Sequence, residues 1–229
     1  MLTPRKTEMK GPIFADFESN EKDELFLLSL RYDGLTTTHI LDERLAPLAD
    51  SKLSEDFNLV VSTPKQAVYQ LVELCRNRDC PLAAYSQTEL DIFKNSFGIE
   101  ISSYLDIRKL AKKWVNKYHK REFEQLDTYK PKSKDRQVKS ATWSLMAYGK
   151  WLNLGLPSKY GRGKVTQRIK DIIGGFNARG PNYSALTPVQ KRKAGDLLRH
   201  NTFDVEGLEK LLKIINAEDG RLVSRLLGR

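Results

Sequence analysis

A two-residue turn signal, Asp33 followed by Gly34, constrains the fold of this chain more than any other feature of its sequence. An Asp-Gly pair between two apolar runs is typical of a β-hairpin with a tight turn. The runs on either side, residues 24–32 and 36–42, are therefore predicted to pair as antiparallel strands. Residues 12–19 have the same strand-like composition and precede them. The first three strands are thus expected to form an antiparallel meander.

After the meander, strands alternate with helices, and helices then dominate. Apolar runs predict short strands at 58–62, 81–85 and 104–107. Capping residues and apolar residues at helical spacing predict helices at 63–76 (capped by Thr63), about 89–97 (capped by Thr88), from 108 onward, 140–154, 165–173, and from Pro188 through 204–215. Breaks are expected at Gly174 and Gly175, and an exposed loop at 130–139. This order predicts an α/β fold with a mixed β-sheet flanked by α-helices.

The composition is that of a soluble globular protein, with 40% hydrophobic and 30% charged residues in 229. We expect one domain, residues 1–229. No apolar run reaches the roughly 20 residues that span a bilayer, and no secretory signal opens the chain, so no membrane association is expected. Cys75 and Cys80 form neither a disulfide framework nor a zinc ribbon, which favours a cytoplasmic location.

Charge is distributed unevenly along the chain. Residues 1–107 carry 11 Lys and Arg against 18 Asp and Glu, a net charge of −7, whereas residues 108–229 carry 28 against 11, a net charge of +17. A basic helical insertion is expected at about 108–199. This asymmetry indicates a polyanionic partner, nucleic acid, bound mainly through the C-terminal half. The alternative is a solvated basic surface with no such partner.

Two carboxylates interrupt the first predicted strand. Asp16 and Glu18 are spaced i, i+2, so in an extended strand they project from one face, about 7 Å apart. Burying two acids in an apolar strand is costly unless they are paired or bind a metal ion. Nucleases that use two metal ions need such carboxylates, and Mg²⁺ prefers oxygen ligands. The alternative is a pair of strand-end acids that face solvent.

A second acidic position lies far along the chain, in a predicted helix. His200 and Asp204 are spaced i, i+4, so both side chains lie on one helix face and can reach one site. Histidine titrates near neutral pH, which suits a general base. The alternative is a polar helix N-terminus capped by Asn201.

Three short motifs in this order resemble those of the DEDD 3′–5′ exonucleases, which have the ribonuclease-H-like fold. They are D-x-E at 16–18, a second motif at 84–93, and H-x-x-x-D at 200–204. The closest similarity is to the YprB-type or RecB-associated ribonuclease-H-like nucleases, which show a Y-S-x-x-E-like second motif. The resemblance spans nearly the whole chain, from Ile13 to Ile215.

Two acids compete for the second motif. Glu89 matches the Y-S-x-x-E form and is the preferred ligand, whereas Asp91, followed by Ile92, resembles the F-D-I form of proofreading exonucleases. They lie two positions apart on a helix, so both cannot face one site. Asp106 precedes a predicted helix, and we expect it to cap that helix rather than bind metal.

The resemblance implies a 3′–5′ exonuclease that hydrolyses DNA or RNA, at a single-stranded 3′ end, with two Mg²⁺ or Mn²⁺ ions. Asp16 would bridge both ions, Glu18 would bind one and orient the attacking water, and Asp204 would be a further ligand. His200 would stand at the general-base position. That position is Tyr in the subgroup with this spacing, and the histidine subgroup places its His one residue upstream, so the base assignment stays open.

The basic segments have a natural use in such a nuclease, because lysine and arginine contact phosphates without reading sequence. Trp114 and Tyr118 either stack on bases or face the core. Two alternative functions remain open, a catalytically inactive nucleic-acid-binding module and a structure-selective endonuclease on the same fold. The residues expected to contact nucleic acid are Lys112, Lys113, Lys117, Arg162, Lys164 and Arg168.

Overall fold

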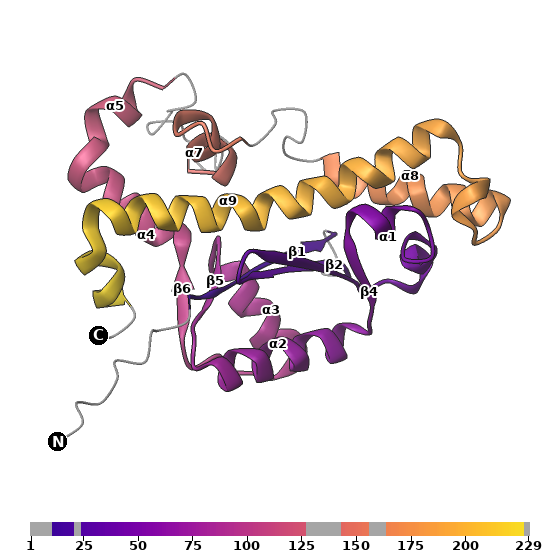
Figure 1. The fold of residues 1–229 in the computed structure, drawn as a ribbon, viewed down its shortest axis with the longest axis horizontal. Coiled ribbons are helices and arrows are strands. Elements are labelled where there is room, and N and C mark those ends of the chain that lie inside the picture. The colour runs from indigo at the N-terminus through magenta and orange to yellow at the C-terminus, as the bar shows by residue number, and fades with distance from the viewer. Residues whose placement is uncertain (1–10, 21–23, 127–142, 156–163, 227–229) are drawn as a thin grey trace.

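A six-stranded mixed sheet with helices on both faces forms the centre of the molecule (Figure 1). The computed structural model describes residues 11–20, 24–126, 143–155 and 164–226. The strand order is β4-β3-β2-β1-β5-β6. The predicted α/β class, with a mixed sheet and an antiparallel N-terminal meander, is therefore confirmed, and the arrangement is consistent with a ribonuclease-H-like fold.

The meander consists of β1 (Ile13–Ser19), β2 (Leu25–Tyr32) and β3 (Leu35–Ile40). Asp33 and Gly34 both have positive φ, 50° and 79°, as the tight hairpin turn requires. This turn sets the register of β2 against β3 and pairs Tyr32 with Leu35. Strand β1 adds to the other edge of β2 in antiparallel orientation.

The remaining strands are short and parallel to their neighbours. Strand β4 (Asn58–Val61) pairs with β3, and η1 (Glu43–Leu48) and α1 (Leu53–Asp56) precede it in the chain. Strand β5 (Leu82–Ala84) pairs with β1, and β6 (Tyr104–Asp106) pairs with β5. Because β1, β5 and β6 run parallel, their carboxyl ends meet at one edge of the sheet.

Helices α2 (Pro64–Arg78) and α3 (Gln87–Phe97) cover one face of the sheet (Figure 1). Thr63 caps α2 as predicted, in a capping box with Gln66. The predicted cap of α3, Thr88, is wrong. Ser86 caps that helix instead, since its side chain accepts from the Thr88 N–H and it shares a capping box with Glu89.

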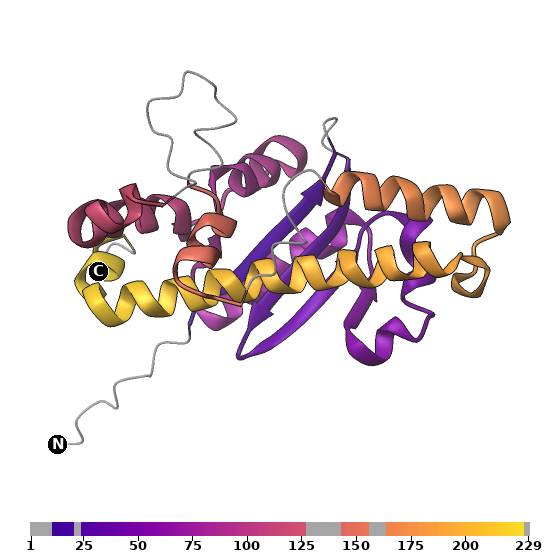
Figure 2. The same ribbon diagram turned by 90° about the horizontal axis from the view of Figure 1, so that it is seen from above.

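The opposite face is covered by the long helix α9, which runs across the strands with α8 beside it (Figure 2). The C-terminal half of α9 packs with the sheet, α4 and α7 in one apolar cluster, and its N-terminal half packs with α8 and η1 in another. The elements of this region are α4 (Ile107–Trp114), the π-helical turn η2 (Val115–His119), α5 (Lys120–Glu124), α7 (Leu145–Trp151), α8 (Lys164–Arg179), η4 (Tyr183–Ala185) and α9 (Pro188–Leu226).

Asp106 caps α4, as predicted, by accepting from the Lys109 N–H at 2.7 Å. The expected break at Gly174 and Gly175 is wrong, because both lie inside α8. Gly175 is where α8 and the start of α9 approach closely, since a Cβ there would stand 2.5 Å from Gln190 Nε2. The predicted loop at 130–139 lies outside the described residues.

No helix in the described ranges combines the length and apolar character needed to cross a membrane.

Candidate metal centre

The apolar stripe of α9 is interrupted where the helix crosses the sheet. Leu198 belongs to the cluster shared with α8, and Val205 belongs to the cluster shared with α4 and α7. Between them lie His200, Asn201 and Asp204. These residues are in the middle of α9, which begins at Pro188, so Asn201 does not cap the helix. Polar side chains in the middle of a packed helix indicate a functional site, and the interpretation of this motif as a polar helix N-terminus is wrong.

Glu18, His200 and Asp204 converge at this crossing. One potential ligand atom from each lies within 4.8 Å of the other two. His200 Nε2 stands 3.0 Å from Asp204 Oδ2 and 3.9 Å from Glu18 Oε1. The side chain of Glu18 is 14% exposed, that of His200 11% and that of Asp204 23%, so the cluster is enclosed but still reached by solvent. Glu18 of β1 therefore lies beside both residues of the 200–204 motif.

The alternation of β1 directs its acids toward α9. Phe14 packs in the α9 cluster, whereas Ile13 and Ala15 pack in the cluster on the opposite face, so Asp16 and Glu18 share the α9 side with Phe14. This is the same-face arrangement that their spacing predicts. Both acids lie near the carboxyl end of β1.

Burial and crowding disfavour the ionised form of these acids. Burial, followed by the charges of Asp204, Glu18 and Glu89, raises the pKa of Asp16 well above its ordinary value. Burial raises the pKa of Glu18 to about 7, with His200 opposing and Asp204 adding to the rise. A divalent cation among them would compensate this charge, and an oxygen-rich set with one imidazole suits Mg²⁺ or Mn²⁺. The residues present therefore fit the metal that the fold resemblance implies.

His200 is held as a hydrogen-bonded partner of Asp204. Burial alone would lower the pKa of His200, but the hydrogen bond and charge of Asp204, helped by Glu18, outweigh burial and raise it. The imidazole therefore holds its proton more tightly beside these carboxylates than it would in water. Its use as a general base stays a prediction.

The two candidates of the second motif lie in different surroundings. Glu89 is 7% exposed, and its charge raises the pKa of Asp16. Asp91 is exposed and lines a separate cavity, so the structure does not bring it into the cluster. Glu89 also accepts from the Ser86 N–H and hydroxyl, both at 3.2 Å. The S-x-x-E pattern is thus a helix capping box as well as a candidate motif.

Six basic residues are predicted to contact nucleic acid, and of the four whose side chains the structure describes, one reaches the cluster. Arg168 on α8 is 9% exposed, and its charge lowers the pKa of both Glu18 and His200. Lys112, half-buried, and Lys113, exposed, lie apart from it on α4. Arg162 lies outside the described residues, as does the side chain of Lys164.

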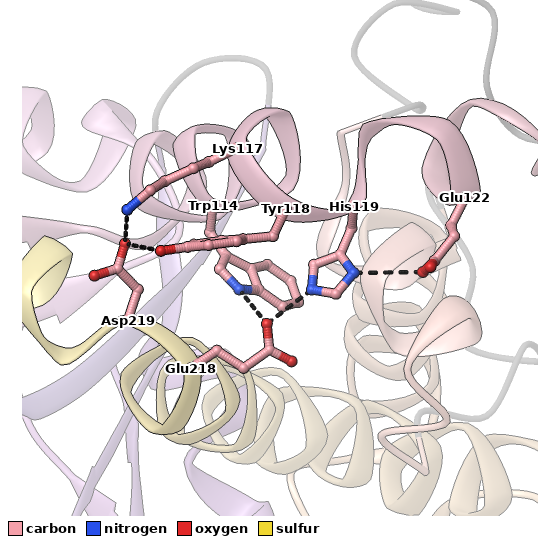
Figure 3. A network of polar contacts seen from close by, with 7 residues as sticks. All are labelled: Trp114, Lys117, Tyr118, His119, Glu122, Glu218 and Asp219. Atoms are coloured by element: carbon pink, nitrogen blue, oxygen red, sulfur yellow. Dashed lines mark hydrogen bonds and ion pairs between the residues drawn. The ribbon is translucent and has the colours of Figure 1, made fainter.

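Lys117 and the neighbouring aromatic residues belong to a polar network that anchors the end of α9 (Figure 3). Asp219, whose backbone is non-helical, accepts from Lys117 Nζ at 2.7 Å and from the Tyr118 hydroxyl at 2.9 Å. Glu218 accepts from Trp114 Nε1 at 2.9 Å. Of the two interpretations of Trp114, the structure supports the core, because this side chain is 1% exposed.

Sequence reasoning missed three buried polar residues beside the site. Asn201 is fully buried, and its amide has no hydrogen-bond partner among the described residues. Ser29, directly opposite Asp16, and Thr38 are buried with their hydroxyl oxygens 2.9 Å apart. The hairpin turn is a signal for this pair, because counting back from Asp33 and Gly34 places Ser29 opposite Thr38.

Comparisons of the chain with protein-family models, with curated proteins and with solved structures give no match. The resemblance to the DEDD exonucleases therefore depends on the motifs, their order and the fold.

Proposed function

We propose that this protein is a 3′–5′ exonuclease of the DEDD type that depends on Mg²⁺ or Mn²⁺ and acts on single-stranded 3′ ends of DNA or RNA. The observation that carries the proposal is the convergence of Glu18, His200 and Asp204 within 4.8 Å. These residues come from segments at opposite ends of the chain and meet where α9 crosses β1. The strand order, consistent with a ribonuclease-H-like fold, supports the same function.

The acids of the cluster have distinct roles in this proposal. Asp16, Glu18 and Asp204 hold the cations, with Glu89 as the fourth carboxylate. When bound, two such ions activate a water molecule and stabilise the leaving oxygen of the cleaved phosphodiester. His200, whose Nε2 stands 3.0 Å from Asp204 Oδ2, would orient the attacking water and accept its proton.

Arg168 contacts the phosphate that is cleaved. It brings the positive charge of α8 next to Glu18 and His200 while remaining 9% exposed. A guanidinium group presents paired donors that match phosphate oxygens, and it is always charged. The excess of basic residues after position 107 supplies the wider attraction for the polyanion.

A cleavage assay tests this function. A single-stranded oligonucleotide labelled at its 5′ end is expected to shorten stepwise from its 3′ end in Mg²⁺ or Mn²⁺ and to stay intact in EDTA. Asp204→Asn and Asp16→Asn are expected to reduce the rate at least 100-fold, because each removes a ligand charge. Asp56→Asn is the matched control, since it changes an exposed acid of α1 outside the cluster, and it is expected to keep the wild-type rate.

Each alternative outcome identifies a different function. Salt-sensitive binding of the oligonucleotide without cleavage in any metal would contradict catalysis and select an inactive binding module. Cleavage of a circular single strand would select an endonuclease, because an exonuclease requires an end. A wild-type rate in Asp16→Asn and Asp204→Asn would show that the activity does not come from this cluster.

A further inference from the structure

A second cavity lies at the same edge of the sheet as the metal centre. It has a volume of about 270 Å³ and is lined by the first turn of α3 and the first turns of α4. These helices follow the carboxyl ends of β5 and β6. Because β1, β5 and β6 are parallel neighbours, the cavity is two strands, roughly 10 Å, from the acids of β1.

Three cations on α4 line this cavity: Arg108, Lys109 and Lys112. Arg108 Nε is buried and has no hydrogen-bond partner among the described residues. Lys112 Nζ lies 5.3 Å from the centre of the Trp143 ring. Burial, followed by the charge of Arg108, lowers the pKa of Lys112, and the charge of Asp106 opposes this only in part.

Within the described part of the chain, neither Arg108 nor Lys112 forms an ion pair with an acid of the cavity. Asp106 caps α4 and forms an ion pair with Lys109 at 3.3 Å, so both of those charges are already engaged. Asp91 is the other acid in the wall, and it is exposed. Arg108 and Lys112 are thus the cations left for a ligand.

Side chains, rather than helix N-termini, supply the attraction here. At the N-terminus of α3, the Ser86 side chain accepts from the Thr88 and Glu89 N–H groups. Asp106 caps the Lys109 N–H, and the Arg108 N–H donates to the Tyr85 carbonyl at 3.0 Å. An anion in the cavity would therefore bind to the guanidinium and ammonium groups, with the Ser86 and Thr88 hydroxyls in the same wall.

We propose that this cavity binds a backbone phosphate of the nucleic-acid strand whose 3′ end is at the metal centre. The inference rests on the proposed nuclease function and adds the path of the substrate, from β1 over β5 to β6. The separation of roughly 10 Å exceeds one phosphate-to-phosphate step of a single strand, so the phosphate in the cavity lies upstream of the one that is cleaved. Glu89 links the two sites, because it accepts from the N–H of Ser86 in the cavity wall and its charge acts on Asp16.

Lys112→Met and Lys113→Met form a matched pair for the test. Both remove one positive charge from α4, but Lys113 is exposed and does not line the cavity. Methionine keeps the apolar stem beside Trp143, and circular dichroism checks that both variants fold. Binding of a labelled single-stranded oligonucleotide is measured by fluorescence anisotropy at several salt concentrations, in an Asp204→Asn background that prevents cleavage.

Lys112→Met is expected to weaken binding 3- to 10-fold and to reduce the slope of log Kd against log salt by about 0.7, the loss of one single-strand phosphate contact. Lys113→Met is expected to change Kd less than 2-fold, because the exposed charge of Lys113 adds only to the general attraction for the polyanion. The difference between the variants is expected to vanish for a dinucleotide, which ends before the cavity.

Equal effects of the two variants, or a Lys112 effect that persists on the dinucleotide, would overturn the inference. Cleavage by the wild-type protein is measured on the same oligonucleotides. If the wild-type protein cleaves but Lys112→Met has no specific effect on binding, only the proposal that the cavity binds a phosphate is rejected. If there is no cleavage, the proposed nuclease function, on which the cavity proposal rests, is rejected.

Discussion

Asp16 and Glu18 are placed where ionised carboxylates are unfavourable. Both pKa values are raised, that of Glu18 to about 7, and burial is the largest cause for each. Glu89 and Asp204 add negative charge to Asp16. Without a cation, this arrangement opposes folding at neutral pH. A site that is strained in the metal-free protein is typical of residues selected for binding rather than for stability.

The pH dependence of the metal-free protein follows from this arrangement. A group whose pKa is raised on folding contributes stability below its unfolded pKa, and that contribution is lost as the pH rises through the folded value. For Glu18 the loss falls between its ordinary value near 4.5 and about 7. Glu18→Gln removes this titration, so its free energy of unfolding relative to wild type is expected to rise with pH, by about 1–3 kcal/mol.

Urea unfolding in EDTA at several values between about pH 5 and pH 8 measures this difference. A difference between Glu18→Gln and wild type that is the same at every pH would contradict the assignment of a raised pKa to Glu18.

At the scale of elements, the packing of α8 against α9 places Arg168 beside the cluster. Gly175 is buried at this contact and Gly174 is exposed. A Cβ at position 175 would meet Gln190 Nε2 at 2.5 Å and a Leu186 methyl at 2.7 Å. The Gln190 amide cannot move freely, since it accepts from the Thr187 N–H and donates to the Asp171 carbonyl at 3.0 Å.

The two adjacent glycines therefore predict opposite effects of the same substitution. Gly174→Ala is expected to stabilise the protein by about 0.5–1 kcal/mol, because nothing described lies within 4 Å of the new methyl group and alanine favours a helix. Gly175→Ala is expected to destabilise it by about 1–3 kcal/mol through overpacking. Thermal unfolding compares the two variants, and stabilisation by both would show that the helices do not approach closely here.

These glycines also show where prediction of the elements from sequence fails. Consecutive glycines favour the end of a helix by local propensity, but the tertiary packing of two helices outweighs that preference at Gly175. The predicted cap of α3, Thr88, is wrong for a local reason, since Ser86 two residues earlier also carries a capping hydroxyl. The reciprocal bond between Ser86 and Glu89 decides it. In contrast, the Asp33 turn, the Thr63 cap and the Asp106 cap were predicted correctly, because each depends on residues that are neighbours in sequence.

At the scale of the whole molecule, the site joins segments nearly the full chain apart. Periodicity predicted that Asp16 and Glu18 share a strand face and that His200 and Asp204 share a helix face, and both are found. The order of the motifs predicted their meeting but not the distances. The proximity of Arg168 depends on how α8 packs against α9, and the separation of Glu89 from Asp91 depends on the orientation of α3. Neither relation is encoded in local sequence.

The central claim is that the crossing of β1 and α9 is a divalent-metal centre. Anomalous diffraction from crystals containing Mn²⁺ tests it most directly. The expected result is two anomalous peaks about 3.5–4 Å apart, enclosed by Asp16, Glu18 and Asp204, and lost in crystals of Asp204→Asn. Crystals at saturating Mn²⁺ that show no peak at this crossing, with His200 still hydrogen-bonded to Asp204, would contradict it.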